Sequence, residues 1–352
     1  MPRSLQSPTV AAPSKQAPQR RSGAELGGAG RVDSEMFGSL YQVAAKKETG
    51  GDMSQLWLPG EDPGKYQFAE DGDGKSPGTG AGARKQQDLA LPALREKHAG
   101  TEYLDYADGA AFVKGAGDAE AVDANDVKQG GLGDCYLIAG MAAVARANPA
   151  AIQKLIKDNG DGTYDVTLYI RKSAYSRPTP VVTRVDGRLA SKTPGSPIYA
   201  GVGDKAEGKT ELWTALIEKT VAQQKGSYDK ISGGNINKDG FNFAGASELL
   251  TGKYENYYNI DSLDEDDALL TIASALESKK PITVDSRNLE ADVDLTKQAT
   301  SRNVYWNHAY APKSVDLDGR TIDLQNPWGS SHVDKLPVDL FIKYYRGIRV
   351  NG

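Results

Sequence analysis

Three segments of this sequence hold side chains that, brought together, could perform acyl transfer with a cysteine nucleophile. Cys135 is the only cysteine, and it follows a glycine-rich stretch, residues 130–133, at the predicted start of a helix. The partial positive charge of a helix N-terminus lowers the pKa of a thiol, and glycines allow positive φ or close backbone approach. His308 supplies a base, and Asn326 an amide that can orient its imidazole. A lone cysteine is more often a small buried apolar side chain, so its role depends on whether these residues meet.

A hairpin would bring the histidine and the asparagine together. Asp318-Gly319 is a strong turn signal between two runs that resemble strands. His308 lies ten residues before this turn and Asn326 lies seven residues after it, so both should return to the same end of the hairpin. Pro312 predicts a bulge that absorbs part of the three-residue difference.

The spacing of apolar residues predicts helices around the cysteine. Residues 135–147 show helical spacing and end at Asn148-Pro149, because a residue that precedes proline disfavours the helical conformation. A second short helix should include residues 152–156. An amphipathic helix should cover residues 210–224.

The rest of the chain shows signals for both kinds of element. Ser262 and Glu265 form a capping-box pattern that predicts the start of another helix. Residues 164–170 alternate as in a strand, and strands dominate from about residue 281 onward. This segregation predicts an α+β fold, in which a helical lobe carries the cysteine and a β-rich lobe carries the histidine and asparagine.

The composition argues against several kinds of site and partner. A single cysteine excludes an internal disulfide and a multi-cysteine zinc site, and the three histidines lack the spacing of metal ligands. A formal net charge of -5 disfavours nucleic acid as a partner. No apolar run reaches the length that spans a membrane.

Residues 1–102 have the composition of a low-complexity, disordered extension, rich in Pro, Gly, Ser, Gln and charge. They lack the apolar stretch of a secretory signal peptide. We expect a cytoplasmic location, or export without a classical signal peptide, and a role for the extension as a propeptide, export signal or docking tail. The folded domain should cover residues 103–352.

The three segments resemble motifs of a known family, the calpain cysteine proteases. Residues 129–137 closely resemble the cysteine motif of the calpain core, with Tyr136 where the family usually has Trp. Residues 307–310 resemble its Gly-His-Ala-Tyr motif, with Asn307 in place of Gly. Residues 326–329 match its Asn-Pro-Trp-Gly motif.

The resemblance extends over about residues 120–350, because parts of 211–235 resemble the segment that joins the two catalytic lobes of the family. It implies a papain-like α+β fold with the active site between two lobes. The roles that it implies are nucleophile for Cys135, base for His308, orienting residue for Asn326, oxyanion donor for Gln129 together with the Cys135 backbone N–H, and a shield over the His–Asn pair for Trp328.

The resemblance leaves the role of calcium open. Asp126 and Glu211 stand where the first of two calpain calcium sites has acidic ligands, and two carboxylates with backbone carbonyls would suit Ca²⁺. An equally good interpretation is that Asp126 is an ordinary surface residue and that Glu211 lies in the first turn of a helix. The second site is expected to be absent, because the loop after Trp328 lacks its acidic ligand. The chain ends soon after Asn326, so the extra C-terminal domains of conventional calpains are expected to be missing.

We interpret the chain as an intracellular-type cysteine endopeptidase that cleaves protein substrates, as a monomer, through a thioester acyl-enzyme. Calcium would be an activator and not part of the chemistry, and self-cleavage is expected between about residues 60 and 115. A papain-like transglutaminase or deamidase is one alternative, although transglutaminases typically have Asp at the position of Asn326. A non-catalytic binding module is the other, disfavoured because the oxyanion glutamine and the whole triad are present.

Overall fold

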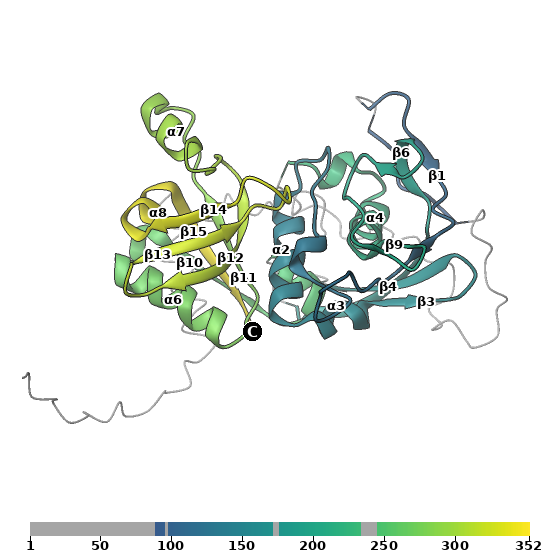
Figure 1. Cartoon of the computed structure of the whole chain (residues 1–352), viewed down its shortest axis with the longest axis horizontal. Helices are drawn as coiled ribbons and strands as arrows, with labels where there is room; N and C mark the ends of the chain where they lie inside the picture. The colour runs from purple at the N-terminus through teal and green to yellow at the C-terminus, as the bar shows by residue number, and fades with distance from the viewer. Residues whose placement is uncertain (1–88, 96–97, 172–175, 234–244) are drawn as a thin grey trace, which may run out of the picture. The chain divides into compact units, whose positions relative to one another are not determined.

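The computed structural model describes residues 89–95, 98–171, 176–233 and 245–352 (Figure 1). These residues form a mixed α+β structure with seven α-helices, α2 to α8, and fifteen strands, β1 to β15. Most of the predicted extension and of the predicted self-cleavage region lies outside the described residues. The segment 89–95 is described, and its Ala93 N–H donates to the Gly226 carbonyl at 3.0 Å, beside a β-bridge to Ser227. This segment therefore packs on the folded body ahead of residue 103.

A first hydrophobic core takes its residues from Tyr106 to Leu250, with Ala311 added from far along the chain. Its four helices are α2 (Cys135–Ala147), α3 (Pro149–Leu155), α4 (Trp213–Lys225) and α5 (Ala246–Thr251). Its strands are β1 (Glu102–Leu104), β2 (Gly109–Ala110), β3 (Ile156–Asp158), β4 (Thr163–Ile170), β5 (Thr179–Asp186), β6 (Leu189–Thr193), β7 (Ser196–Pro197), β8 (Lys205–Ala206) and β9 (Lys209–Glu211). They form the described three-stranded sheets β1-β6-β7, β2-β9-β8 and β3-β4-β5.

The cysteine-bearing part is thus mixed and not mainly helical, which corrects the sequence prediction. The predicted strand over residues 164–170 is confirmed as β4. Most of the other strands have only two or three residues, too few for an alternating pattern to be visible in the sequence.

Helix α2 spans the predicted residues 135–147. Asn148 ends it and also caps α3, because its side chain accepts a first-turn N–H at 3.2 Å while Pro149 takes the first helical position. Helix α3 ends at Leu155, one residue earlier than predicted. Ile156 instead begins β3, where it pairs with the neighbouring strand β4.

The starts of two other helices also differ from the sequence prediction. Helix α4 begins at Trp213, because residues 210–211 belong to strand β9. Helix α6 (Glu265–Glu277) is capped by Asp264, whose carboxylate accepts a first-turn N–H at 2.8 Å. Ser262 lies in a preceding 3-10 helix and donates its hydroxyl to a carbonyl there. The predicted capping box of Ser262 and Glu265 is therefore wrong.

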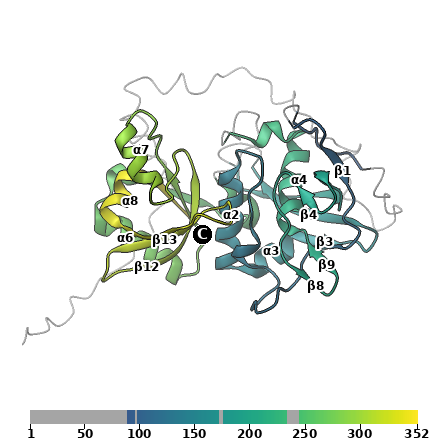
Figure 2. The ribbon, with the colours of Figure 1, turned by 45° about the horizontal axis from the view of Figure 1, so that its top comes forward.

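A second hydrophobic core combines a six-stranded sheet with helices α6 and α8 (Figure 2). The strand order is β10-β15-β11-β12-β13-β14, and the described pairings are antiparallel. The strands are β10 (Glu255–Asn259), β11 (Ile282–Ser286), β12 (Ala309–Asp316), β13 (Thr321–Gln325), β14 (Val333–Pro337) and β15 (Tyr345–Asn351). The remaining helices are α7 (Val293–Thr300) and α8 (Val338–Tyr344). The predicted predominance of strands after residue 281 is confirmed.

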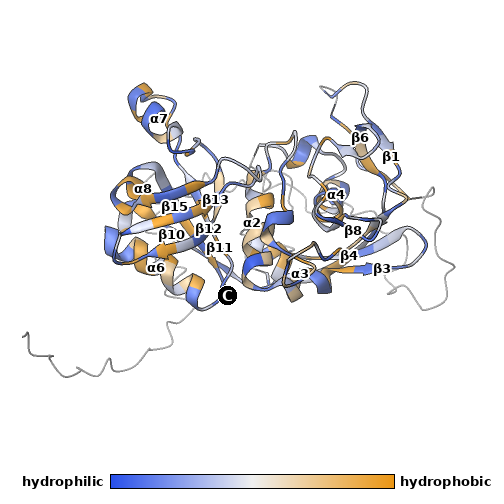
Figure 3. Cartoon of the chain, viewed as in Figure 1, coloured by the Kyte–Doolittle hydropathy of each residue, from blue (hydrophilic) through white to orange (hydrophobic). Residues whose placement is uncertain are grey.

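Helix α2 contacts elements of both cores. It packs against α3, α4 and α5, and also against strands β11 and β12. Figure 3 shows its largely apolar character, and its residues from Leu137 to Ala145 are all buried. Gly140 lets α5 come close, because an added Cβ would lie 2.4 Å from the Cβ of Ala246.

Among the described residues, no single helix has both the length and the apolar character needed to cross a membrane; α2 and α3 meet the test only when taken together, across a bend of 118°.

The cap of α6 gives a test of this local structure. Replacing Asp264 with Ala should lower the free energy of unfolding by about 1 kcal/mol, because a first-turn N–H loses its acceptor. Ser262→Ala is the matched control, and it should change stability by a few tenths of a kcal/mol at most. Urea denaturation of the two variants checks this, and an equal effect of both would restore the capping box.

Candidate active site

The hairpin of β12 and β13 brings His308 and Asn326 to the same end of the sheet, as the sequence predicts. Ala311 pairs with Gln325, and the register shifts after Pro312, which confirms the bulge. The turn itself differs from the expectation: four residues, 317–320, connect the strands, and the positive φ of 51° falls on Arg320.

A hydrogen bond of 2.9 Å joins His308 Nε2 to Asn326 Oδ1. An amide oxygen only accepts, so Nε2 carries the proton and Nδ1 is left as the basic atom. Asn326 is itself fixed, because its Nδ2 donates to the Ser331 carbonyl at 3.3 Å and its backbone N–H donates to His332 Nδ1 at 3.2 Å. The hairpin therefore holds the imidazole in one tautomer and one orientation.

Aromatic rings surround the imidazole. The Trp328 ring lies 4.8 Å from the His308 ring and the Tyr310 ring lies 4.9 Å from it, edge-on. The Tyr305 ring lies 4.5 Å from the Trp328 ring and 6.3 Å from the His308 ring. Burial lowers the pKa of His308, while the bond to Asn326 opposes that shift. Trp328 keeps 40% of its surface exposed, so the ring that contacts the imidazole also contacts solvent.

Cys135 is the first residue of α2, and its thiol accepts the backbone N–H of Ala309, the residue after the histidine. Burial, together with the charges of Asp134 and Asp285, raises the pKa of this thiol to about 11. This result is opposite to the expectation from the helix N-terminus, because desolvation of the thiolate outweighs the partial charge of the helix end. Among the described residues, no hydrogen bond joins the thiol to His308. The raised pKa thus favours the neutral form of a thiol that lies beside the histidine strand.

The glycines before Cys135 serve close packing and not positive φ. An added Cβ on Gly130 would lie 1.8 Å from the Tyr199 carbonyl oxygen, and the Gly131 N–H donates to the Ile198 carbonyl at 2.7 Å. None of the three glycines has a positive φ. The loop is therefore held tightly against the segment before α4.

Gln129 makes contacts on two sides. Its backbone N–H donates to the Pro327 carbonyl at 2.8 Å, which ties the cysteine loop to the asparagine segment. Its side-chain Nε2 donates to the Leu132 carbonyl at 2.7 Å and to Asp134 Oδ1 at 3.3 Å. Its Oε1 is buried and has no donor among the described residues. The amide is thus engaged within its own loop.

The sequence reasoning missed a second connection, at the other end of α2. Arg146 donates to the Pro312 carbonyl at 3.2 Å and to the side-chain oxygen of Gln325. Gln325 Nε2 in turn donates to the Ala124 carbonyl at 2.6 Å. We call these contacts the Arg146–Gln325 clamp. One sequence feature could have indicated the clamp: Arg146 is the single charged residue of an otherwise apolar helix.

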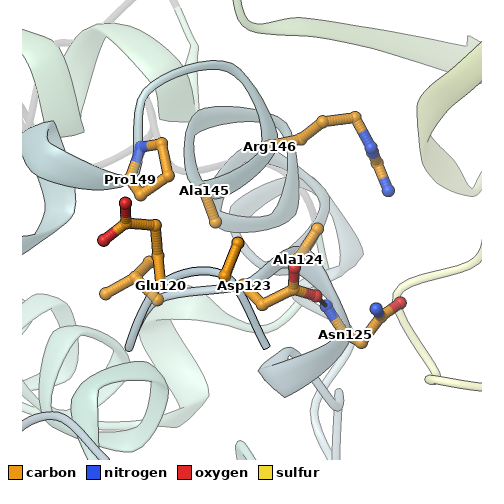
Figure 4. Close-up of a pocket in the computed structure, with 9 residues that line it drawn as sticks. Glu120, Asp123, Ala124, Asn125, Ala145, Arg146 and Pro149 are labelled. Atoms are coloured by element: carbon orange, nitrogen blue, oxygen red, sulfur yellow. Dashed lines mark hydrogen bonds between the residues drawn. The ribbon is translucent and has the colours of Figure 1, made fainter. Parts of the chain in front are cut away.

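A cavity of about 260 Å³ lies beside the clamp, at the C-terminal end of α2 (Figure 4). Its lining includes Glu120, Asp123, Asn125, Arg146 and Pro149. Figure 4 shows the Arg146 side chain extending away from Glu120 and Pro149. Because neither Cys135 nor the triad partners line it, this cavity is separate from the candidate active site.

Asp126 and Glu211 lie close together inside the protein, so Asp126 is not the surface residue of the alternative interpretation. Glu211 is the last residue of β9 and not part of a helix. Asp126 accepts the Trp213 indole N–H at 3.2 Å, and Glu211 accepts the Val113 N–H at 2.9 Å. Burial raises their pKa values to about 6 and about 8, and nearby carboxylates add to this, Asp204 and Asp123 for Asp126, and Asp126 and Asp204 for Glu211. An added Cβ on Gly203 would lie 2.1 Å from Glu211 Oε2 and 3.2 Å from Asp126 Cβ, so the glycine leaves space between the carboxylates.

The described residues contain no group of three or more His, Cys, Asp and Glu side chains arranged to hold a metal. Two buried carboxylates that repel each other nevertheless fit a hard cation, provided that backbone carbonyls complete its oxygen ligands.

Comparison with known proteins agrees with this geometry. Residues 115–334 match the model of a family described as calpain family cysteine protease. Calpain-8 of Mus musculus is 28% identical over 213 residues, which are 58% of this chain and 28% of the relative. Calpain clp-4 of Caenorhabditis elegans is 27% identical over 213 residues, 58% of this chain and 27% of the relative. The calpain-2 catalytic subunit of Gallus gallus is 28% identical over 211 residues, again 58% and 28%. The chain therefore spans less than a third of the length of these relatives.

The raised pKa of Cys135 gives a test that needs no substrate. The rate of alkylation by iodoacetamide should rise about tenfold per pH unit and continue to rise up to about pH 10, because only the thiolate reacts. A single cysteine makes the label specific, and Cys135→Ser is the blank. A rate that levels off near neutral pH would show that the thiol is already ionised there.

Proposed function

This chain belongs to the calpain family of cysteine proteases, and we propose from this premise that it is an endopeptidase with a Cys135–His308–Asn326 triad. The observation that carries the proposal is the 2.9 Å bond between His308 Nε2 and Asn326 Oδ1, next to the Trp328 ring. Family membership also implies a papain-like fold. Protein substrates, and a monomeric enzyme, belong to the same proposal.

The proposed reaction is acyl transfer. His308 Nδ1 takes the proton of Cys135, and the thiolate adds to a peptide carbonyl carbon. The imidazolium then protonates the leaving amine, which gives a thioester, and a water molecule activated by the same imidazole hydrolyses it. Gln129 Nε2 and the Cys135 backbone N–H stabilise the oxyanion. Trp328 keeps water from the His–Asn bond.

In the structure the thiol accepts the Ala309 N–H, and burial favours its neutral form. We propose that substrate, or a shift of the hairpin relative to α2, brings the thiol to His308 Nδ1. A thiolate beside an imidazolium is far more stable than one in an apolar setting, so the pair ionises together once in contact.

We further propose that calcium supports this state through Asp126 and Glu211. A divalent cation would remove the repulsion between the two carboxylates. The site lies next to the chemistry in sequence, since Asp126 precedes Gln129 by three residues and Glu211 lies two residues before the start of α4. The ion supplies positive charge that holds these segments together and takes no part in bond breaking.

Casein hydrolysis tests the triad. Cys135→Ser and His308→Ala should each lower kcat/KM by roughly 10³-fold or more, because nucleophile and base act as a unit. Asn326→Ala should have a smaller effect, mainly on kcat, since the imidazole loses only its orientation. Ser262→Ala serves as a folded control with wild-type activity. Wild-type protein that cleaves neither casein nor its own chain, with or without calcium, would refute the proposal.

Thermal unfolding tests calcium independently of activity. A hundredfold excess of Ca²⁺ over its dissociation constant should raise Tm by roughly 5 to 10 °C relative to chelator. Glu211→Gln and Asp126→Asn should remove that increase, and Mg²⁺ should not reproduce it. Asp158→Asn, at an exposed turn, is the matched control and should keep the increase. An unchanged Tm of the wild type would show that these carboxylates hold no calcium.

A further inference from the structure

Asp134, the residue before the nucleophile, occupies the N-cap position of α2 but does not cap it. An aspartate there usually accepts a first-turn N–H with its side chain. Here the Leu137 and Ile138 N–H groups go to the Asp134 backbone carbonyl, and the side chain makes no cap bond. The carboxyl is fully buried. A charged group that is buried without capping the helix must have another partner.

That partner is Glu218 of α4, which is also buried. The Ala200 N–H donates to its two carboxyl oxygens at 3.0 and 2.9 Å, and the Asp134 and Glu218 side chains are hydrogen-bonded to each other. Two carboxyl oxygens attract only if one of them carries a proton. Asp134 Oδ2 has no other donor among the described residues. One proton must therefore lie between the two side chains.

The surroundings favour retention of this proton. Burial raises the pKa of Asp134 to about 6 and that of Glu218 well above its usual value. Within the part of the chain that the structure describes, the other titratable groups that face the pair are tyrosines and the thiol, and none is a lysine or an arginine. They are Tyr103, Tyr136, Tyr199, Tyr228 and Cys135. Loss of the proton would leave two negative charges in contact with no cation, so the pair would separate.

The second oxygen of Asp134 connects this pair to the active site. Asp134 Oδ1 accepts one N–H of Gln129 Nε2 at 3.3 Å, while the Leu132 carbonyl accepts from the same nitrogen at 2.7 Å. The position of Asp134 therefore decides where the amide lies. The longer bond is the weaker one, so it is the N–H that a substrate oxyanion would take.

We propose that Asp134 and Glu218 share one proton and act as a positioning pair that holds the Gln129 amide next to the nucleophile. This inference rests on the proposed protease function, because stabilising the oxyanion of that reaction is the role proposed for the Gln129 amide. Glu218 touches no reacting atom and acts only through Asp134. Separation of the pair at high pH would release the amide and lower kcat.

Two substitutions of Glu218 separate the shared proton from simple packing. Gln keeps an N–H for Asp134 and an oxygen for the Ala200 N–H, but does not titrate. Leu keeps the volume and offers neither. We expect Glu218→Leu to lower kcat roughly 10- to 100-fold with little change in KM, and Glu218→Gln to restore most of kcat without the loss at high pH. Gln129→Ala should add little to Glu218→Leu, and additive losses would overturn the proposal.

The Gln129 side-chain amide gives a readout that does not depend on catalysis. Its NMR resonance is assigned by its disappearance in Gln129→Ala. Between about pH 6 and pH 10 it should shift with one titration in the wild type and stay constant in Glu218→Gln. A resonance that does not titrate in the wild type, or that titrates equally in Glu218→Gln, would refute the proton shared by Asp134 and Glu218, whatever the activity of the protein. A titrating resonance in a protein that cleaves nothing would refute the protease and leave the pair standing.

Discussion

The packing of helix α2 against strands β11 and β12 is the interaction on which the site depends. The helix is buried from Leu137 to Ala145, and each large apolar side chain in such a position contributes about 1.5 to 3 kcal/mol. Small residues on the helix keep its neighbours close, as at Gly140. At one end the Cys135 thiol meets the Ala309 N–H, and at the other Arg146 reaches the hairpin. The nucleophile and the base are therefore positioned by one interface.

The same burial that fixes this geometry opposes ionisation. It raises the pKa of the Cys135 thiol and lowers that of His308, so both groups are neutral at rest. The carboxyls of Asp126, Glu211 and Glu218 are pushed in the same direction, toward their neutral forms. Burial thus shifts several acids close to the site toward their uncharged forms. An incoming cation or a proton transfer within the site then has a large effect, because each charge appears in a poorly solvated place.

Local signals in the sequence were sufficient for the hairpin and for α2. The turn signal and Pro312 predicted which ends of the strands would meet, and the helical spacing from Cys135 predicted α2 with its observed limits. The family resemblance assigned roles to His308 and Asn326 that the 2.9 Å bond makes plausible in space. These features depend on residues that are close in the chain or on regular periodicity.

What the sequence could not predict depends on distances between remote segments. The Arg146–Gln325 clamp joins residues that are 179 positions apart. The desolvation that raises the Cys135 pKa comes from packing and leaves no local pattern. Asp134 reads as an ordinary N-cap residue until Glu218 is seen beside it. Likewise, the parallel pairing of β2 with β9 comes from segments about one hundred residues apart and too short to recognise.

Because the clamp holds the C-terminal end of α2, a small tilt of the helix about that end would move its N-terminal end. Eleven residues separate Arg146 from Cys135, which is about 17 Å along the helix axis at 1.5 Å per residue. A tilt of only about 5° around the clamp would therefore move the thiol by roughly 1.5 Å. A displacement of about 1 Å in a reacting group can change a rate by about 100-fold. A well-packed helix pivoting at its polar end can thus switch the site without unfolding any element or exposing either core.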